Sequence, residues 1–229
     1  MICHGDAREI LPAIPKDSVD AVLTDPPFFM PAVHYQSRID WQRSWSDTSI
    51  LATFWAAILD LVIPSIKPTG HFLTFCNGDS YPVFYPEMYR RFDSLKLLVW
   101  DKGRVGLGRI WRNQHELVIA ARWNESRFVE DGLLRADIFR STPTRSAKRE
   151  HPVQKPYAVL SWLLKPCVPR GGTILDPFAG SGTILEAAAS LGLKVIAIEG
   201  EERYCKIMAK CLNRESQETL PPGTSGRST

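Results

Sequence analysis

The chain has 229 residues, of which 44% are hydrophobic and 23% are charged. This size and composition fit one globular domain with a sizeable core, and they exclude a disordered or fibrous protein. The net charge is only +3, but residues 90–150 hold 14 Lys and Arg against 8 Asp and Glu, a local excess that suits a polyanionic partner.

The five cysteines are odd in number and form no CxxC pair. They indicate reduced thiols rather than a disulfide framework or a zinc site, so no metal is expected. From the sequence we expect no apolar run as long as a membrane span, and the first residues do not resemble a signal peptide. We therefore expect a soluble, cytoplasmic protein.

The first predicted element is a buried strand over residues 19–24, which ends where two prolines follow Asp25. Residues 29–48 are polar and aromatic without a period, which predicts a long, mobile loop. Apolar residues at helical spacing predict a helix over 49–66. The turn residues that follow lead into a strand over 71–75.

The middle of the chain continues with a helix over about 80–92. Two strands are predicted next, over 95–100 and 116–121. Residues 122–150 are basic and irregular, so no element is predicted there.

The last third alternates helix and strand. A helix over 157–166, with Pro156 in a first-turn position, is followed by a strand over 173–175. A helix over 183–191, a strand over 194–198 and a helix over 201–212 complete the pattern.

Residues 214–229 are rich in Ser, Thr, Gly and Pro, and we expect them to be disordered. The alternation of strands and helices predicts an α/β domain with a mostly parallel sheet. Asp25, Asp176 and Glu199 each follow a predicted strand. Because ligands bind beyond the carboxyl ends of parallel strands, these three acids should meet at one edge.

A Gly-rich turn links the strand at 173–175 to the next helix. Gly180 and Gly182 permit a tight turn with backbone N–H groups near a ligand. No Lys follows, so it is not a P-loop, and Asp176 would repel phosphates but suit a cation. Glu199, 23 residues after Asp176, is placed to accept both hydroxyls of a ribose. A cofactor with a ribose, a positive centre and no phosphate fits S-adenosylmethionine.

Residues 25–28 read Asp-Pro-Pro-Phe. The amino nitrogen of adenine or cytosine is a poor nucleophile because its lone pair is delocalised into the ring. The Asp25 carboxylate and the Pro26 carbonyl can accept both amino hydrogens, and the two prolines preorganise these acceptors. Phe28 offers a face on which the base can stack.

Three segments together resemble a known family. Asp25–Phe28 matches the motif D/N/S-P-P-Y/F/W, Asp176–Thr183 matches a cofactor motif, and His151–Pro156 matches H-P-x-Q-K-P. In this permuted order they are similar to the β group of DNA amino-methyltransferases, which act on adenine N6 or cytosine N4. The resemblance covers about residues 2–213. It implies one methyltransferase domain with a mostly parallel, seven-stranded, Rossmann-like sheet, helices on both faces and circularly permuted motifs.

The resemblance also implies site residues. Asp6 would bind the adenine of S-adenosylmethionine, Glu199 its ribose, and residues 154–156 would border its methionine end. The implied catalytic residues are Asp25, Pro26, Pro27 and Phe28. The implied cofactor-binding residues are Asp6, Asp25, Gln154, Lys155, Pro156, Asp176, Phe178, Ala179, Gly180, Ser181, Gly182, Thr183 and Glu199.

Double-stranded DNA is the predicted substrate, bound along the basic region at 102–150. Trp100–Lys102 and Asn113–Glu116 resemble the segments around the target base in the family. The predicted nucleic-acid contacts are Lys102, Arg104, Arg109, Arg112, Asn113, His115, Arg145, Lys148 and Arg149. The stretch between Asn113 and His151 is short for a region that reads DNA sequence. Specificity would then come from the 29–48 loop or a partner subunit, or be low.

Adenine N6 is the favoured target because Asp is the first letter of the catalytic motif, with cytosine N4 as the alternative. Phe28 replaces the commoner Tyr, which keeps the stacking but removes a hydroxyl contact. A homodimer and a cognate restriction enzyme are further predicted partners. Other open interpretations are an RNA methyltransferase, an inactive DNA-binding subunit and a nicotinamide oxidoreductase, although the last gives residues 25–28 no role.

Overall fold

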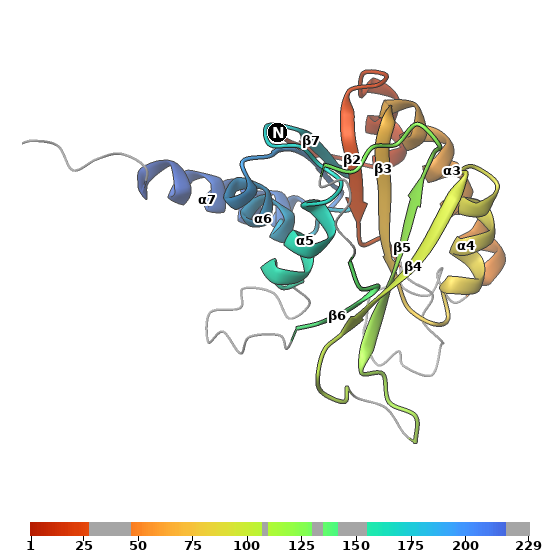
Figure 1. The fold of residues 1–229 in the computed structure, drawn as a ribbon. Helices are drawn as coiled ribbons and strands as arrows, with labels where there is room; N and C mark the ends of the chain where they lie inside the picture. Colours follow the sequence, from red (N-terminus) through yellow and green to blue (C-terminus); the bar gives the residue numbers. More distant parts are fainter. Residues whose placement is uncertain (28–46, 107–109, 130–134, 142–154, 219–229) are drawn as a thin grey trace, which may run out of the picture.

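The computed structural model describes residues 1–27, 47–106, 110–129, 135–141 and 155–218. These residues form an eight-stranded sheet with strand order β1-β8-β7-β2-β3-β5-β4-β6 (Figure 1). The strands are β1 Ile2–His4, β2 Val19–Thr24, β3 Ile66–Cys76, β4 Ser94–Asp101, β5 His115–Arg122, β6 Ile138–Arg140, β7 Thr173–Asp176 and β8 Lys194–Glu199. The α/β class and the mostly parallel sheet are confirmed, but the sheet has eight strands rather than the predicted seven.

Six α-helices and two 3-10 turns connect the described strands. The helices are α1 Ala7–Ile10, α3 Thr48–Val62, α4 Tyr81–Tyr89, α5 Tyr157–Leu164, α6 Thr183–Leu191 and α7 Glu202–Glu218. The turns are η1 Leu11–Ala13 and η3 Ile63–Ser65. Helices α5, α6 and α7 cover one face of the sheet, and α3 and α4 cover the other (Figure 1), so the predicted two-faced arrangement is confirmed.

The strand directions explain why one edge of the sheet collects functional groups. Strands β1, β8, β7, β2 and β3 are mutually parallel, and β5 runs antiparallel to both β3 and β4. In this register Cys76 pairs with Leu117, and Asp101 pairs with His115. The carboxyl ends of β3 and β4 therefore lie beside the start of β5, at the edge where β2, β7 and β8 also end.

Helix α3 shows how the apolar pattern builds the core. Asp47 caps its start by accepting hydrogen bonds from the backbone N–H groups of Ser49 and Ile50. The buried side chains recur at helical spacing, and Trp55 stacks on Phe84 of α4 with ring centroids 4.4 Å apart. Contrary to the sequence-based expectation, residues 48–65 are long and apolar enough to span a membrane by length and composition alone. One face of the helix nevertheless packs into the core cluster.

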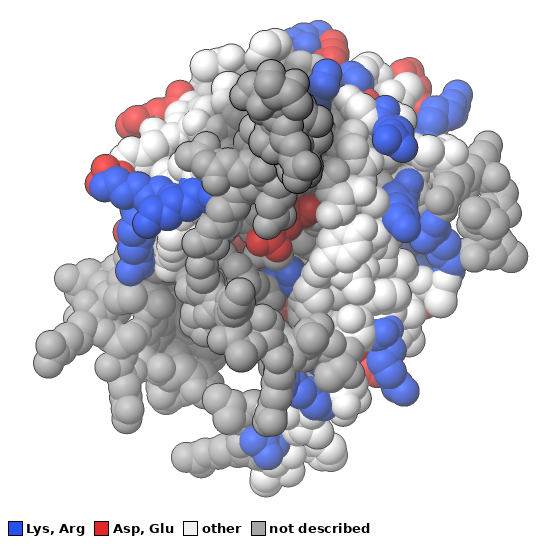
Figure 2. Space-filling view, turned by 90° about the vertical axis from the view of Figure 1, so that its left-hand side faces the viewer, with Lys and Arg blue, Asp and Glu red and all other residues white. Residues whose placement is uncertain are grey.

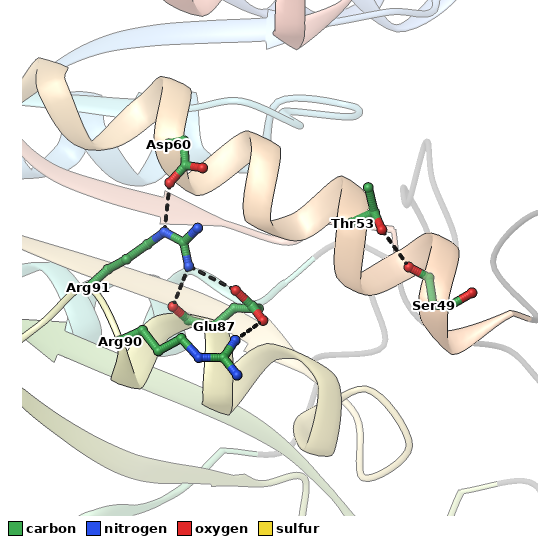
Figure 3. A network of polar contacts seen from close by, with 6 residues as sticks. All are labelled: Ser49, Thr53, Asp60, Glu87, Arg90 and Arg91. Carbon is green, nitrogen blue, oxygen red and sulfur yellow. Dashed lines mark hydrogen bonds and ion pairs between the residues drawn. The ribbon is translucent and has the colours of Figure 1, made fainter.

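An arginine joins α3 to the end of α4 on the outside of this layer. Arg91 donates to the Asp60 carboxylate on α3 at 2.8 Å and to Glu87 on α4 at 2.9 Å, while Arg90 pairs with the same Glu87 (Figure 3). The two helices are thus tied at their surface as well as through their buried faces.

The N-terminal half departs from the predicted elements at the start of β3. β3 begins at Ile66 and runs through Pro68–Gly70, which were predicted to be a turn. The β2–β3 register shifts between Val19 and Ala21, and such an irregularity can hold a proline. The backbone passes so close here that a Cβ on Gly70 would lie 2.7 Å from the Asp20 carbonyl.

Three further departures lie at sheet edges and helix ends. The three-residue strands β1 and β6 were not predicted, because neither is long enough to show a period. Helix α7 runs to Glu218, so the expectation of disorder from 214 is wrong for its first residues. Pro156 is the N-cap of α5 rather than its first helical residue. Residues 219–229 and most of the predicted 29–48 loop lie outside the described residues.

Candidate active site

Four carboxylates from four strands gather at the common edge of the sheet. Asp25 follows β2, Asp176 ends β7, Glu199 ends β8, and Glu116 stands near the start of β5. The predicted meeting of the first three is supported by the charge interactions of Asp176 with Asp25 and Glu199. Figure 2 shows acidic side chains and a basic group deep in a hollow on one face of the molecule.

The Gly-rich turn after β7 is held by its own backbone. The Asp176 carboxylate accepts hydrogen bonds from the Phe178 backbone N–H at 3.0 Å and from the Thr24 hydroxyl at 2.9 Å. The Ala179 backbone N–H donates to the Ile198 carbonyl on β8 at 2.9 Å. These bonds fix the turn against the neighbouring strands before any ligand is bound.

Both glycines of the turn have left-handed backbone conformations. Gly180 has φ of 53° and Gly182 has φ of 84°, values that favour glycine. A Cβ on Gly182 would meet the Met208 side chain of α7 at 2.4 Å, whereas a Cβ on Gly180 would meet nothing within 4 Å. Gly182 therefore serves close packing, and Gly180 leaves open space beside the turn.

Glu199 faces this turn from the next strand. Its carboxylate accepts hydrogen bonds from the Gly180 backbone N–H at 2.7 Å and from the Glu201 backbone N–H at 2.8 Å. Each oxygen has a second lone pair that is free to accept from another donor. The carboxylate is thus oriented by the backbone and can take two hydroxyl donors, as the prediction of a ribose contact requires.

Asp176 is buried, and the described residues place no cation in contact with it. Burial raises the pKa of its carboxyl to about 7, and the charges of Asp25 and Glu199 add to this, while the Phe178 and Thr24 hydrogen bonds oppose it. No Lys, Arg or His among the described residues forms an ion pair with Asp176 or Glu199. A cationic ligand at this point would favour the ionised carboxylate.

Asp6 lies next to Glu199, because the Gly5 backbone N–H donates to the Glu199 carbonyl at 3.0 Å. The Asp6 side chain caps α1 and pairs with Arg8, whose hydrogen bond lowers the pKa of the Asp6 carboxyl. A hollow of about 370 Å³ lies between α1 and the start of α3, and Arg8 and Phe54 are among its lining residues. Phe54 also contacts Phe178 of the Gly-rich turn, with ring centroids 5.8 Å apart.

On the other side of the edge, Asp25 is bound to a lysine. Lys155 donates to Asp25 Oδ2 at 2.7 Å and to Glu116 Oε2 at 2.8 Å. Lys102 donates to Glu116 Oε1 at 2.9 Å. Asp25 Oδ1 is buried and has no hydrogen-bond partner among the described residues. The adjacent Pro26 is buried and Pro27 is half-buried, so the backbone beside Asp25 is firmly held.

Comparison with known proteins identifies the chain. The sequence profile of the N6_N4_Mtase family, described as DNA methylase, matches residues 19–210. The chain belongs to this DNA methylase family. The predicted family resemblance and its DNA methyltransferase activity are thereby confirmed, and the oxidoreductase interpretation is set aside.

Relatives of this methylase cover nearly its whole length. It is 25% identical to the type II methyltransferase M2.LlaDCHI of Lactococcus lactis subsp. cremoris, over 93% of this chain and 89% of that protein. It is also 25% identical to the type II methyltransferase M2.DpnII of Streptococcus pneumoniae, over 95% and 91%.

Solved structures show the same fold. The complex of M1.HpyAVI with SAM matches with a TM-score of 0.68 and 22% identity, over 92% of this chain and 100% of that one. The PvuII DNA methyltransferase, described as cytosine-N4-specific, matches with a TM-score of 0.69 and 15% identity, over 93% and 92%. The cofactor in the first complex agrees with the one predicted for this methylase.

The predicted DNA contacts of the methylase separate into two groups. Arg104, Arg112 and Asn113 are exposed on the connection between β4 and β5, and His115 is exposed at the first residue of β5, at the edge of the sheet where the carboxylates gather. Lys102, by contrast, is a partly buried member of the ion-pair network around Glu116. A role for Lys102 in binding phosphate directly remains a prediction that its position does not favour.

Several predicted residues of the methylase lie outside the described residues. They are Phe28, Arg109, Arg145, Lys148, Arg149, His151 and Gln154. The remaining cofactor-binding predictions, Phe178, Ala179, Ser181 and Thr183, belong to the turn after β7 or to the first residue of α6. Within the described ranges, no three His, Cys, Asp or Glu side chains come together in a way that could hold a metal ion.

Sequence reasoning missed residues that the structure places in the site of the methylase. Glu116 was quoted only as part of a motif and was given no role, yet it binds both lysines. Thr24 binds Asp176 but is an ordinary strand residue in the sequence. Lys155, assigned to the cofactor by resemblance, contacts Asp25. Its position in a motif marks it as functional, but no sequence signal indicates this pairing.

Proposed function

We propose that this DNA methylase transfers a methyl group from S-adenosylmethionine to the N6 amino group of an adenine flipped out of double-stranded DNA. The observation that carries the proposal is the Asp25 carboxylate, held through one oxygen beside the cofactor turn, with no hydrogen-bond partner for the other oxygen among the described residues. Residues 1–213 would act as a single methyltransferase domain.

The cofactor half of the site, around Asp176 and Glu199, fits S-adenosylmethionine. Asp176 is a buried carboxylate without a counter-ion in the described part of the chain, which suits a positively charged ligand. Glu199 is oriented to accept two ribose hydroxyls, and the space beside Gly180 lets a ligand approach the turn. When bound, S-adenosylmethionine supplies a methyl group on a sulfonium, which is an intrinsically good leaving group.

The acceptor half of the site, around Asp25 and Glu116, fits a neutral base with an amino group. Asp25 Oδ1 would accept one amino hydrogen, and the Pro26 carbonyl would accept the other. Both bonds favour a tetrahedral nitrogen and localise its lone pair, which then attacks the methyl carbon. The cofactor would supply the methyl group with the bond electron pair left on its sulfur, and the surplus proton would pass from the nitrogen to solvent. Asp25 orients and polarises the amine, so no separate general base is required.

DNA would lie against the exposed residues of the β4–β5 connection. Arg104 and Arg112 would bind phosphates near the site, with Asn113 and His115 closer to the base. Flipping the adenine costs a few kcal/mol, which stacking on Phe28 would partly offset. A homodimer and a cognate restriction enzyme remain predicted partners, and sedimentation of the free and DNA-bound protein would test the first.

The proposal is tested by expressing the protein in cells without DNA methylation and sequencing plasmid DNA with base-resolved detection. We expect N6-methyladenine at a defined set of sites. Methylation of cytosine N4 would keep the mechanism and change the base. Methylation of RNA alone would refute DNA as the substrate.

A separate rate assay with radiolabelled S-adenosylmethionine tests the proposed catalytic carboxylate. Asp25→Ala should lower methyl transfer by on the order of a thousandfold, because the amine loses its preorganised acceptor. Binding of S-adenosylmethionine should be reduced but still measurable. Radiolabelled methyl transfer at nearly the wild-type rate would show that Asp25 does not take part in the reaction.

A further inference from the structure

Four side chains at the acceptor half form a line of alternating charge. Lys102 binds one oxygen of Glu116 at 2.9 Å, and Lys155 binds the other at 2.8 Å. Lys155 then binds Asp25 Oδ2 at 2.7 Å. The line contains two lysines and two carboxylates, so it is neutral as a whole. It runs from the base of the β4–β5 connection to the catalytic carboxylate.

Lys155 is held more firmly than an ordinary surface lysine. Its side chain is only 8% exposed, and its ammonium lies 4.7 Å from the centre of the Phe75 ring. It precedes Pro156, which restricts the backbone of Lys155 to extended conformations. The Pro156 carbonyl accepts from the Val159 and Leu160 backbone N–H groups at the start of α5. The start of α5 therefore fixes the backbone position from which the Lys155 ammonium extends.

This fixed cation opposes the cost of burying Asp25. Burial raises the pKa of the Asp25 carboxyl, and Lys155 opposes that rise, whereas Glu116 adds to it. Burial alone would lower the pKa of Lys155, but Asp25 and Glu116 raise it, so the ammonium stays charged. Burial also raises the pKa of Glu116, and the two lysines more than reverse this. The other titratable groups that act on Asp25 are Asp176, Cys76 and Lys102.

The ammonium occupies only one oxygen of the catalytic carboxylate. Asp25 Oδ2 carries the bond to Lys155, and Oδ1 is buried without a partner in the described part of the chain. A buried carboxylate oxygen without a donor is costly and is therefore matched to a donor from a ligand. The bond at Oδ2 fixes which oxygen faces that donor.

We propose that Lys155, held in place by Glu116, is a positioning residue that stabilises the ionised form of Asp25 and turns its Oδ1 toward the amino hydrogen of the target base. This inference rests on the proposed methyl transfer and adds what prepares its acceptor. It differs from the role that the family resemblance implies for Lys155, which is contact with the cofactor.

Two substitutions with opposite expected effects test the proposal. In Lys155→Met the buried carboxylate loses its cation, so the pKa of Asp25 rises. In Glu116→Gln a neighbouring negative charge is removed while Lys155 remains, so the pKa of Asp25 falls. The acid limb of the kcat–pH profile on methylatable DNA should therefore move up by about one unit or more in the first variant and down in the second. We also expect kcat to fall more than the affinity for S-adenosylmethionine in Lys155→Met.

The pKa of Asp25 can also be measured without turnover. Carbon-13 NMR of the Asp carboxyls, with Asp25→Asn for assignment, follows the titration in the free protein. Lys155→Arg keeps the cation and should leave the midpoint within about half a unit of the wild type. Lys96→Met removes an exposed lysine that pairs with Asp137 at 3.0 Å, and it should change nothing.

An unshifted titration in Lys155→Met, with weaker binding of S-adenosylmethionine, would assign Lys155 to the cofactor and overturn the proposal. Shifts of the same sign in Lys155→Met and Glu116→Gln would also overturn it. If Lys155→Met does not fold, the downward shift in Glu116→Gln and the retained midpoint in Lys155→Arg decide the matter. A wild-type protein that methylates no DNA would refute the proposed function, while the NMR titration would still decide the role of Lys155.

Discussion

The two halves of the site satisfy their carboxylates in opposite ways. In the cofactor half, Asp176 and Glu199 accept hydrogen bonds from backbone N–H groups and a hydroxyl, all of them neutral donors. In the acceptor half, Asp25 and Glu116 are bound by lysine ammonium groups. The acceptor half is therefore neutralised by lysines, whereas the cofactor half has no cation paired with its carboxylates among the described residues, and burial raises the pKa of Asp176 to about 7.

This difference matches the charges of the two proposed ligands. A cationic cofactor gains most from carboxylates that still lack a counter-ion, because neutral donors orient them without cancelling their charge. A neutral base needs an oriented acceptor but no net charge, and surplus negative charge there would only add a desolvation cost. The two halves are also built from different secondary-structure elements. The cofactor half comes from the parallel strands, and the acceptor half includes the antiparallel β5 and the start of α5.

The largest expected effect comes from disturbing the Gly-rich turn that shapes the cofactor half. Gly182→Ala forces φ of 84° on an alanine and places its Cβ 2.4 Å from Met208. Left-handed strain and overpacking together should lower the free energy of unfolding by about 3 kcal/mol, measured by urea denaturation. Gly180→Ala is the matched control. Its Cβ meets nothing within 4 Å, so it should cost about 1 kcal/mol.

The same pair separates packing from binding. Because the Cβ of Gly180→Ala would occupy space proposed for the cofactor, that variant should lose more affinity for S-adenosylmethionine than stability. Calorimetric titration of each folded variant measures this. Equal losses of stability in the two variants would show that Met208 yields and that the contact does not hold the turn.

A second prediction removes the charge of Glu199. Glu199→Gln keeps the shape of the side chain but replaces one acceptor oxygen by an amide NH2 donor and removes the charge from the ribose contacts. The affinity for S-adenosylmethionine should fall by about tenfold to a hundredfold, since hydrogen bonds to a charged group contribute about 1.5–3 kcal/mol. Glu201→Gln, on an exposed neighbour, is the control and should bind normally. Equal binding by both variants would place the ribose elsewhere.

The cofactor half could be predicted from the sequence almost completely. Asp176, the two glycines and Glu199 all stand at strand ends or in one short turn, so their positions follow from local pattern and parallel topology. Helix α6 was predicted with its observed bounds, Thr183–Leu191, because the Gly-rich turn marks its start and Gly192 its end. Most of the donors in this half are backbone N–H groups, which need no particular side chain; the exception is the Thr24 hydroxyl, a long-range partner of Asp176 that the sequence did not indicate.

The acceptor half could be predicted only in part. Asp25 was predicted as the catalytic carboxylate, but its partner Lys155 lies 130 positions later in the sequence. The position of Glu116 depends on β5 running antiparallel to β3, a pairing that local periodicity does not specify. The strands β1 and β6 were missed for a related reason, since three residues carry no period and are ordered by their neighbours.

The third prediction concerns the unpaired charge of Asp176. With the pKa of its carboxyl raised to about 7, the free protein is largely protonated there below neutral pH. A bound cation favours the ionised form, so binding releases a proton, and affinity should rise with pH. Between about pH 5.5 and pH 7 the affinity for S-adenosylmethionine should increase by up to about tenfold per unit. Asp176→Asn should flatten this dependence.

Thr24→Val provides a second test of the pH dependence of S-adenosylmethionine binding. Without the hydroxyl that donates to Asp176, the pKa of this carboxyl should rise further, so the increase in affinity moves to higher pH. A wild-type affinity that is constant across this range would show that Asp176 does not face a cation, and the contrast between the two halves would lose its basis.

The smallest effect is expected outside both halves, on the exposed β4–β5 connection. Arg104→Gln with Arg112→Gln should reduce the slope of log K against log salt for DNA binding by about two, because each phosphate contact contributes about 0.9. Arg203→Gln, on exposed α7, is the control and should leave the slope unchanged. Lys102→Gln should also leave it unchanged while lowering turnover, since Lys102 is already bound to Glu116. A slope that falls in Lys102→Gln instead would make this lysine a phosphate contact, and the acceptor half would then be neutral only while DNA is absent.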